Sequence, residues 1–265
     1  MPRPTVKTKK NKKRRITLLL IAGFILAGLA TWYLIITVKE ENERRRSEAA
    51  FYDAFGIDMP GNYTIHGIDV SSHQKLIHWP SVKSMTVNNT QLNFVFIKAT
   101  EGLNDVDKQF KTNWLNARAI GMTCGAYHFF LATKSGAKQA ANFISAVPLA
   151  PGDLPPVLDI EELYGVPPAM MRKRVKECLD SLESYYKIRP ILYSYVDFYE
   201  KYLGKDFDTY PLWVAHYLEP QKPRIKREWV FWQHSDAGRV NGITTPVDFN
   251  VFKGDSLQFR ALLIK

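Results

Sequence analysis

The sequence predicts an α/β protein whose strands close into a modified TIM-like barrel, preceded by one transmembrane helix. One observation is a series of eight apolar, strand-like segments after residue 64, the first of them separated by stretches long enough for helices. A second is an uncharged run of 23 residues at 16–38, which is long enough to cross a bilayer as a helix. A third is a 46% apolar composition, which suits a globular domain with a sizeable core.

The amino-terminal segment carries most of the positive charge. Residues 1–15 hold eight lysines and arginines and no acid, whereas the whole chain has a net charge of +10. The net charge of residues 16–265 is therefore close to zero, and we expect no nucleic-acid partner. A basic block before an apolar run predicts a cytoplasmic N-terminus and an exported remainder, in the periplasm or at the cell surface. A long signal peptide cut near Ala30 is the alternative.

These features divide the chain into four parts. We expect a basic cytoplasmic tail at 1–15, a transmembrane signal anchor at 16–38, a stalk or linker at 39–61 and an exported domain at 62–265. The stalk is expected because its first half, at 39–50, is rich in charged, helix-favouring side chains.

Eight strands are expected in the exported domain. The first five begin about 30 residues apart, which leaves room for a helix in each crossover, whereas the last four begin only about 17–21 residues apart. We therefore expect about five βα units and then extra strands with short or missing helices. Helices are expected at 107–120, 135–147 and 168–186. The strands are expected at 65–70, 94–99, 125–131, 156–161, 191–195, 212–217, 229–234 and 247–251.

The fourth strand should end in two carboxylates, Asp159 and Glu161. Side chains at i and i+2 of a strand share one face, so these acids should project together from α-carbons about 6–7 Å apart, with Ile160 packed behind. Glycoside hydrolysis uses such a pair, one acid protonated and one ionised, and like charges so close push the two pKa values apart. The alternative is an ordinary strand end at which both acids meet solvent or cap a helix.

Two further acids should reach the same mouth. Asp69 ends the first strand, and Asp248 lies near the start of the last strand. Active sites of β/α barrels form at the C-terminal ends of the strands, and the first and last strands of a closed barrel are neighbours. Four carboxylates are therefore expected together, although either of these two alone would be an ordinary turn or capping acid.

No metal or cofactor is expected. The six histidines lack H-x-x-x-H and H-x-H spacing, and the sequence contains neither a P-loop nor a Gly-x-Ser-x-Gly motif. Cys124 and Cys178 lack C-x-x-C spacing, so neither a zinc site nor a redox motif is indicated. The two cysteines form either one disulfide or two buried free thiols.

Seven segments, in order along the chain, carry a resemblance to a known family. They are GIDVS at 67–71, FVFIKATEG at 94–102, GAYHF at 125–129, PVLDIE at 156–161, LYSY at 192–195, LWVA at 212–215 and VDFN at 247–250. On these segments the exported domain resembles glycoside hydrolase family 25, the Chalaropsis-type lysozymes or N-acetylmuramidases. The tail, the apolar run and the stalk lie outside the resemblance.

The resemblance implies cleavage of the β-1,4 bond between N-acetylmuramic acid and N-acetylglucosamine in peptidoglycan. It implies that Glu161 is the general acid that protonates the leaving oxygen. Asp159 would either stabilise positive charge at the anomeric carbon or orient the acetamido group of the substrate, and Asp69 and Asp248 would support them. Retaining, inverting and substrate-assisted routes stay open, because strand geometry fixes α-carbons rather than carboxylate oxygens.

Aromatic and polar side chains near the expected mouth are candidate substrate contacts, since sugar rings have apolar faces and polar edges. About half of the aromatics there are expected to be core. One departure from the family is the segment 72–74, where relatives often place a tryptophan near the glutamine, and it affects one stacking contact. The candidate contacts are Lys98, Tyr127, Tyr195, Trp213 and Gln233.

The sequence is compatible with several hypotheses about function. The leading one is a membrane-anchored muramidase, with a monomeric catalytic domain, that remodels the cell's own wall. Attack on the walls of other bacteria is a second reading, less natural for a tethered enzyme. A catalytically silent wall-binding module and a chitinase-like glycosidase are the remaining alternatives.

Overall fold

The computed structural model describes residues 7–47 and 49–265, with the side chains of 18–40 and 50–265. The chain forms two compact units, Met1–Glu48 and Ala49–Lys265. Residues 1–6 of the expected basic tail lie outside the described residues.

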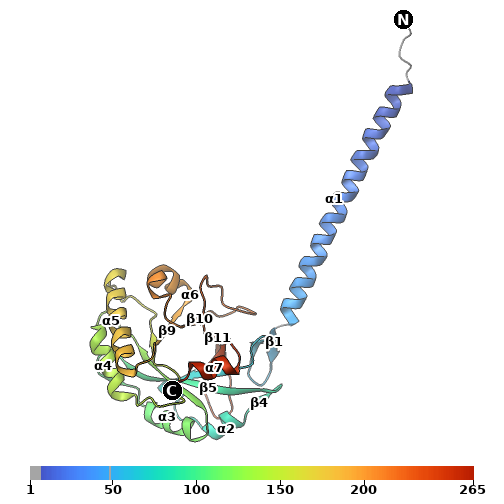
Figure 1. Cartoon of the computed structure of the whole chain (residues 1–265). Coiled ribbons are helices and arrows are strands. Elements are labelled where there is room, and N and C mark those ends of the chain that lie inside the picture. Colours follow the sequence, from blue (N-terminus) through green and yellow to red (C-terminus); the bar gives the residue numbers. More distant parts are fainter. Residues whose placement is uncertain (1–6, 48) are drawn as a thin grey trace. The chain divides into compact units, whose positions relative to one another are not determined.

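The first unit is a single long helix, α1, which runs from Lys7 to Ser47 (Figure 1). Its stretch Leu18–Glu40 is long and apolar enough to cross a membrane, and none of it is buried. This stretch overlaps the expected anchor at 16–38. An exposed apolar surface of this length is unfavourable in water.

The second unit begins with a β-hairpin that was expected to be linker. Strands β1 (Ala49–Tyr52) and β2 (Ile57–Pro60) pair antiparallel. The intervening Phe55 is fully buried and packs on Phe249, with ring centroids 5.0 Å apart. The backbone N–H of Arg239 also donates to the carbonyl of Phe55 at 2.8 Å.

The compact unit thus starts at Ala49, ahead of the boundary expected at residue 62. The physical reason is burial: the side chains of Ile57 and Met59 face the core while Asp58 between them is exposed. Alternation of this kind is the pattern of a half-buried strand.

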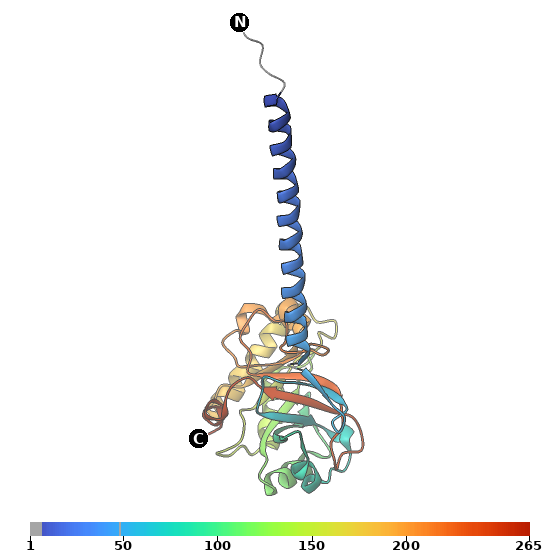
Figure 2. The ribbon, with the colours of Figure 1, turned by 90° about the vertical axis from the view of Figure 1, so that its right-hand side faces the viewer.

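Eight strands then close into a barrel (Figures 1 and 2). Each neighbouring pair is parallel from β3 through β5, β7, β8, β9 and β10 to β11. Strand β12 lies antiparallel between β11 and β3 and closes the sheet. All eight expected strands are confirmed: β3 (His66–Val70), β5 (Thr90–Glu101), β7 (Thr123–Phe129), β8 (Val157–Asp159), β9 (Ile191–Tyr195), β10 (Leu212–Ala215), β11 (Phe231–Gly238) and β12 (Val247–Phe252). Two short strands, β4 (Thr86–Val87) and β6 (Asp105–Val106), pair with β5.

Helices pack outside the first part of the barrel. The three expected helices are confirmed as α3 (Phe110–Ala119), α4 (Gly136–Ala146) and α5 (Pro168–Tyr186). The described residues that join β10 to β11 and β11 to β12 contain no helix. The shorter helical segments are the 3-10 turn Ser72–Gln74, α2 (Trp79–Ser84), α6 (Val196–Phe198), the π-helical turn Tyr199–Leu203, the 3-10 turn Gly204–Phe207 and α7 (Ser256–Leu262).

The TIM-like expectation needs correction at the end of the chain. A TIM barrel has eight parallel strands, each followed by a helix. Here β12 is antiparallel to both neighbours, and the last two connections between strands lack helices. The fold is thus a closed eight-stranded mixed barrel with helices on its first part. The short spacing of the last strands, which leaves little room for a helix in the connections between them, is the reason.

Aromatic rings fill the bottom of the barrel. Phe94 and Phe96 of β5 contact Phe231 of β11, each with ring centroids 5.1 Å apart. Trp213 of β10 stacks on Phe96 at 4.3 Å and forms the top of this layer. The interior is therefore a packed floor below the mouth rather than a pore.

Two glycines make this floor possible. A Cβ on Gly67 would lie 2.5 Å from the ring of Phe94, and a Cβ on Gly125 would lie 2.5 Å from the ring of Phe96. A side chain at either position would point into the barrel and displace a buried ring.

Inward-facing residues change from apolar to polar along the parallel strands β8 and β9. On β9, Ile191 packs in the floor and Tyr193 lies above it. On the antiparallel β12 the order reverses: Asp248 comes first and Phe252 last. An acid at the start of β12 therefore reaches the same mouth as acids at the ends of the parallel strands.

Both cysteines are buried free thiols, so the disulfide alternative is excluded. Cys124 lies in β7 and Cys178 in α5. Burial raises the pKa of Cys124 to about 12, which keeps the thiol protonated and unreactive.

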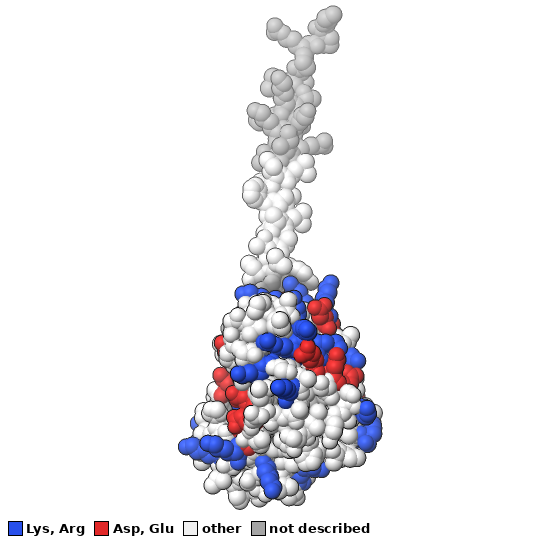
Figure 3. All heavy atoms as spheres, turned by 90° about the vertical axis from the view of Figure 1, so that its left-hand side faces the viewer, with Lys and Arg blue, Asp and Glu red and all other residues white. Residues whose placement is uncertain are grey.

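Charges of both signs are interspersed on the face of the second unit drawn in Figure 3. On α5, Lys176 pairs with Asp180 one turn away, and Arg189 just beyond the helix pairs with Glu183 at 3.3 Å. Such exposed pairs stabilise a helix only modestly.

The hairpin should be required for full stability. We expect a fragment 62–265 to unfold at a lower temperature than 49–265, because it exposes the surface covered by Phe55, Ile57 and Met59. Loss of this burial should lower the free energy of unfolding by ~3 kcal/mol or more, or about 6–12 °C in a domain of this size. Thermal denaturation of both fragments, with Phe55→Ala in 49–265 as an intermediate case, measures it. Equal melting temperatures would contradict the assignment of the hairpin to the domain core.

Candidate active site

All four expected acids line one cavity at the mouth of the barrel. The cavity has a volume of about 290 Å³, and its lining includes Asp69, Asp159, Glu161 and Asp248. The expected convergence of the four carboxyl groups is thus observed. Four of the five candidate contacts line the same cavity: Lys98, Tyr127, Trp213 and Gln233.

Asp159 and Glu161 lie side by side at the end of β8. The strand ends at Asp159, and the N–H of the next residue, Ile160, donates to the carbonyl of Tyr193 at 3.0 Å. Ile160 is fully buried in the outer core, so the acids on either side of it face the cavity. The alternation expected from the D-x-E sequence is therefore present.

Asp69 and Asp248 are cross-strand partners in the pairing of β3 with β12. Their side chains are hydrogen-bonded to each other. A hydrogen bond between two carboxyl groups requires a proton on one of them. Burial, followed by the neighbouring Asp69, raises the pKa of Asp248 to about 9, so the shared proton is retained at neutral pH.

Two amides hold the carboxylate of Asp69. Its Oδ2 accepts from Nδ2 of Asn250 at 2.7 Å and from Nε2 of Gln233 at 2.9 Å. Asn250 is itself oriented by Trp213, whose Nε1 donates to its Oδ1 at 2.7 Å. The aromatic floor thus fixes the direction of an amide that points at Asp69.

Two tyrosines fix the second amide. The hydroxyl of Tyr193 donates to Oε1 of Gln233 at 2.8 Å, and that of Tyr217 donates to the same oxygen at 2.7 Å. With its oxygen occupied, Gln233 can only present its NH₂ group to Asp69. The network therefore opposes the effect of burial, which by itself raises the pKa of Asp69.

Asp159 and Asp69 are the two most buried acids of the site. The side chain of Asp159 is 6% exposed, and its Oδ1 has no hydrogen-bond partner among the described residues. Burial, with the charges of Glu161 and Asp69, raises its pKa well above the usual range. A buried carboxyl oxygen without a partner that faces a cavity is available to a ligand.

Glu161 is partly exposed at the rim. Burial is the main cause that raises its pKa. A carboxyl group with a raised pKa can hold a proton near neutral pH and donate it, as a general acid requires.

Lys98 lies beside the acids but is already paired. Its Nζ donates to Oε2 of Glu101 at 2.6 Å and lies over the ring of Phe129. The pair leaves the cavity dominated by carboxyl groups.

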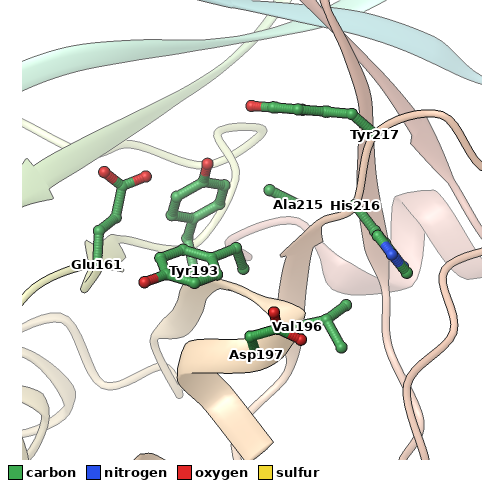
Figure 4. Close-up of a pocket in the computed structure, with 8 residues that line it drawn as sticks. Glu161, Tyr193, Val196, Asp197, Ala215, His216 and Tyr217 are labelled. Atoms are coloured by element: carbon green, nitrogen blue, oxygen red, sulfur yellow. The ribbon is translucent and has the colours of Figure 1, made fainter.

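Tyr195, the fifth candidate contact, lines a second cavity instead. This cavity, of about 360 Å³, shares Glu161, Tyr193 and Tyr217 with the first (Figure 4). Tyr195 is 41% exposed at its rim. The two cavities thus meet at Glu161.

The sequence-based list of site residues omitted Tyr193, Tyr217 and Asn250. A period-two signal was available for two of them, since Tyr193 precedes Tyr195 by two residues and Asn250 follows Asp248 by two. Tyr217 lies just past β10, where no strand period places its side chain.

The model of the family "Glycosyl hydrolases family 25" matches residues 68–243, two thirds of the chain. The chain belongs to glycosyl hydrolase family 25. It is therefore a glycosidase. The match includes Asp69, Asp159 and Glu161 but ends before Asp248, which the antiparallel β12 brings to the same cavity.

Relatives of this family 25 glycosidase cover most of its length. It is 44% identical over 210 residues to "Uncharacterized protein YegX" of Escherichia coli K12, and the aligned region covers 79% of this chain and 77% of the relative. It is 36% identical over 217 residues to "Lysozyme M1" of Streptomyces globisporus, covering 75% and 71%. A family 25 glycosyl hydrolase from Bacillus anthracis superposes with a TM-score of 0.69 at 34% identity, covering 75% of this chain and 93% of that one. The bacterial lysozyme from Streptomyces coelicolor gives 0.68 at 34% identity, covering 75% and 96%.

The acidic site should lower the stability of this glycosidase at neutral pH. An acid whose pKa is higher in the folded state binds an extra proton there, so the free energy of unfolding falls as the pH rises between the unfolded and folded pKa values. For Asp248 this window runs from 3.8 to about 9. We expect the melting temperature of Asp248→Asn to equal that of the wild type near pH 4 and to exceed it by several degrees near pH 8. Thermal denaturation at a series of pH values across this range measures the difference.

Asp58→Asn provides the control, because Asp58 is an exposed acid outside the cavity. A melting-temperature difference for Asp248→Asn that stays constant with pH would contradict the raised pKa.

Proposed function

We propose that this glycosidase is a peptidoglycan hydrolase of the lysozyme type, which cleaves the β-1,4 bond between N-acetylmuramic acid and N-acetylglucosamine. Its relatives include proteins named "Lysozyme M1", "Autolytic lysozyme" and "N,O-diacetylmuramidase". The single observation that carries the proposal is the pair Asp159 and Glu161, which face one acidic cavity in a family 25 domain.

In this proposal Glu161 is the general acid. Its proton passes to the glycosidic oxygen as the bond from that oxygen to the anomeric carbon breaks. The bonding electrons stay with the leaving oxygen, and positive charge develops at the anomeric carbon. The rim position of Glu161, between two cavities, supports this role because a sugar can lie on either side of it.

Asp159 acts on the side of the anomeric carbon. Its free Oδ1 and its burial behind Glu161 fit two roles: stabilising the developing positive charge, or accepting from the acetamido N–H of the substrate. Asp69 and Asp248 share a proton and keep the local field negative, which favours the same charge development. Lys98, Tyr127, Trp213 and Gln233 form the walls that contact the sugar.

We further propose that α1 anchors the enzyme in the cytoplasmic membrane. The basic residues at 1–15 favour a cytoplasmic N-terminus, and the monomeric domain would then lie outside that membrane. A tethered hydrolase reaches the wall of its own cell, so remodelling of that wall is the biological role that fits best.

Activity should depend on Glu161. We expect the full chain to release fragments with muramic acid at their new reducing ends from purified peptidoglycan. Glu161→Gln removes the transferable proton and should lower the rate by about 10²–10⁴-fold, the usual contribution of general acid catalysis. Chromatography of borohydride-reduced products measures both quantities.

Glu162→Gln is the matched control, since Glu162 is the adjacent exposed acid and does not line the cavity. Binding of peptidoglycan without cleavage would support a silent wall-binding module. Glucosamine at the new reducing ends would contradict the assigned bond, and a preference for chitin would favour a chitinase-like enzyme.

Membrane attachment should depend on the apolar run. Deleting residues 16–38 should move the protein from the membrane to the soluble fraction, because no other described segment is long and apolar enough to span a bilayer. In intact spheroplasts, added protease should digest the domain but spare an N-terminal tag. Digestion of the tag would contradict the proposed orientation.

A further inference from the structure

We call the second cavity the Asp197 cavity, and the first cavity, which the four acids line, the acid cavity. The two cavities differ in part of their lining. Both share Glu161, Tyr193 and Tyr217. Asp69, Asp159 and Asp248 line only the acid cavity, whereas Asp197 lines only the second. The other residues that line the Asp197 cavity are Tyr195, Val196, Ala215 and His216 (Figure 4).

The Asp197 cavity is lined by tyrosine rings and by two carboxyl groups, those of Glu161 and Asp197. Tyr195 and Tyr217 are 41% and 37% exposed, so their rings are accessible for stacking. Asp197 is exposed at the start of α6, and among the described residues no hydrogen bond or ion pair engages its carboxylate. No described lysine or arginine lines this cavity.

The histidine of the cavity is already engaged. Its Nδ1 accepts from the backbone N–H of Arg224 at 3.0 Å, and its Nε2 lies 3.5 Å from Oε1 of Glu219. His216 therefore forms a fixed wall, and Asp197 is the polar group left to a ligand. A volume of about 360 Å³ lies at the lower end of small-ligand sites, about 300–1,000 Å³, and suits a sugar residue rather than a large ligand.

The position of Glu161 sets the direction of a bound glycan. If Glu161 protonates the glycosidic oxygen, that oxygen lies where the two cavities meet. Asp159 serves the anomeric carbon and lines only the acid cavity, so the sugar that carries this carbon lies there. The leaving sugar must then extend into the Asp197 cavity.

We propose that the Asp197 cavity binds the leaving-side sugar, with Asp197 accepting hydrogen bonds from its hydroxyl and acetamido N–H groups. This inference rests on the proposed function. It gives the glycan a polarity, with its reducing end beyond Asp197. It also gives a preference for the sugar on the leaving side, because the Asp197 carboxylate repels an ionised lactyl carboxylate. A neutral N-acetylglucosamine is therefore favoured over an unsubstituted muramic acid on the leaving side.

Calorimetric titration tests this assignment on the full chain in detergent micelles, with Glu161→Gln to prevent turnover. The probes are the disaccharide N-acetylglucosaminyl-N-acetylmuramic acid and the tetrasaccharide of two such units. We expect Asp197→Ala to weaken tetrasaccharide binding about tenfold or more, which is about 1.4 kcal/mol, and to change disaccharide binding less than twofold. Asp197→Asn, which keeps a hydrogen-bonding oxygen, should weaken the tetrasaccharide by less.

Glu200→Gln is the matched control, because Glu200 is an exposed acid three residues further along that does not line either cavity. Equal weakening of both probes by Asp197→Ala, or no weakening of the tetrasaccharide, would overturn the assignment. Wild-type cleavage of peptidoglycan is measured separately. Cleavage combined with Asp197-independent binding would leave the function intact and refute the Asp197 cavity, whereas Asp197-dependent binding without cleavage would refute only the function.

Discussion

Holding four carboxyl groups in one small cavity requires that protons and amide donors offset their mutual repulsion. Asp248 and Asp69 do so by sharing a proton, and Gln233 and Asn250 donate to Asp69 from the opposite side. Asp159 Oδ1 has no such partner among the described residues, and burial raises the pKa of this carboxyl group well above the usual range. The chemistry of the site therefore follows from burial that the rest of the barrel imposes.

The barrel imposes this burial through its floor and its closing strand. Stacked aromatic rings reach up to Trp213, which orients Asn250, and glycines in β3 and β7 leave room for those rings. The closing strand β12 runs against its neighbours, which places Asp248 opposite Asp69. Stability is lowered at these acids and recovered in the core, as is common at functional sites.

Strand period and spacing predicted the eight strands, the paired acids of β8 and the convergence of Asp69 with Asp248, because these depend on the local backbone and on barrel closure. The folded hairpin was missed because the charged segment before it resembles a linker. The roles of Tyr193, Tyr217 and Asn250 could not be predicted, because they depend on side-chain hydrogen bonds to Gln233 and Asp69, which are far away in the sequence. Tyr195 was assigned to the mouth correctly, but which of two cavities it lines depends on the loops around it.

The proposed chemistry requires that Glu161 keep its proton at a pH where an ordinary glutamate has lost it. Carbon-13 NMR of protein labelled at the glutamate side-chain carboxyl carbons, assigned by comparison with Glu161→Gln, measures this directly. We expect a titration midpoint for Glu161 above its ordinary value of 4.5. A midpoint at or below that value would contradict the role of Glu161 as the proton donor.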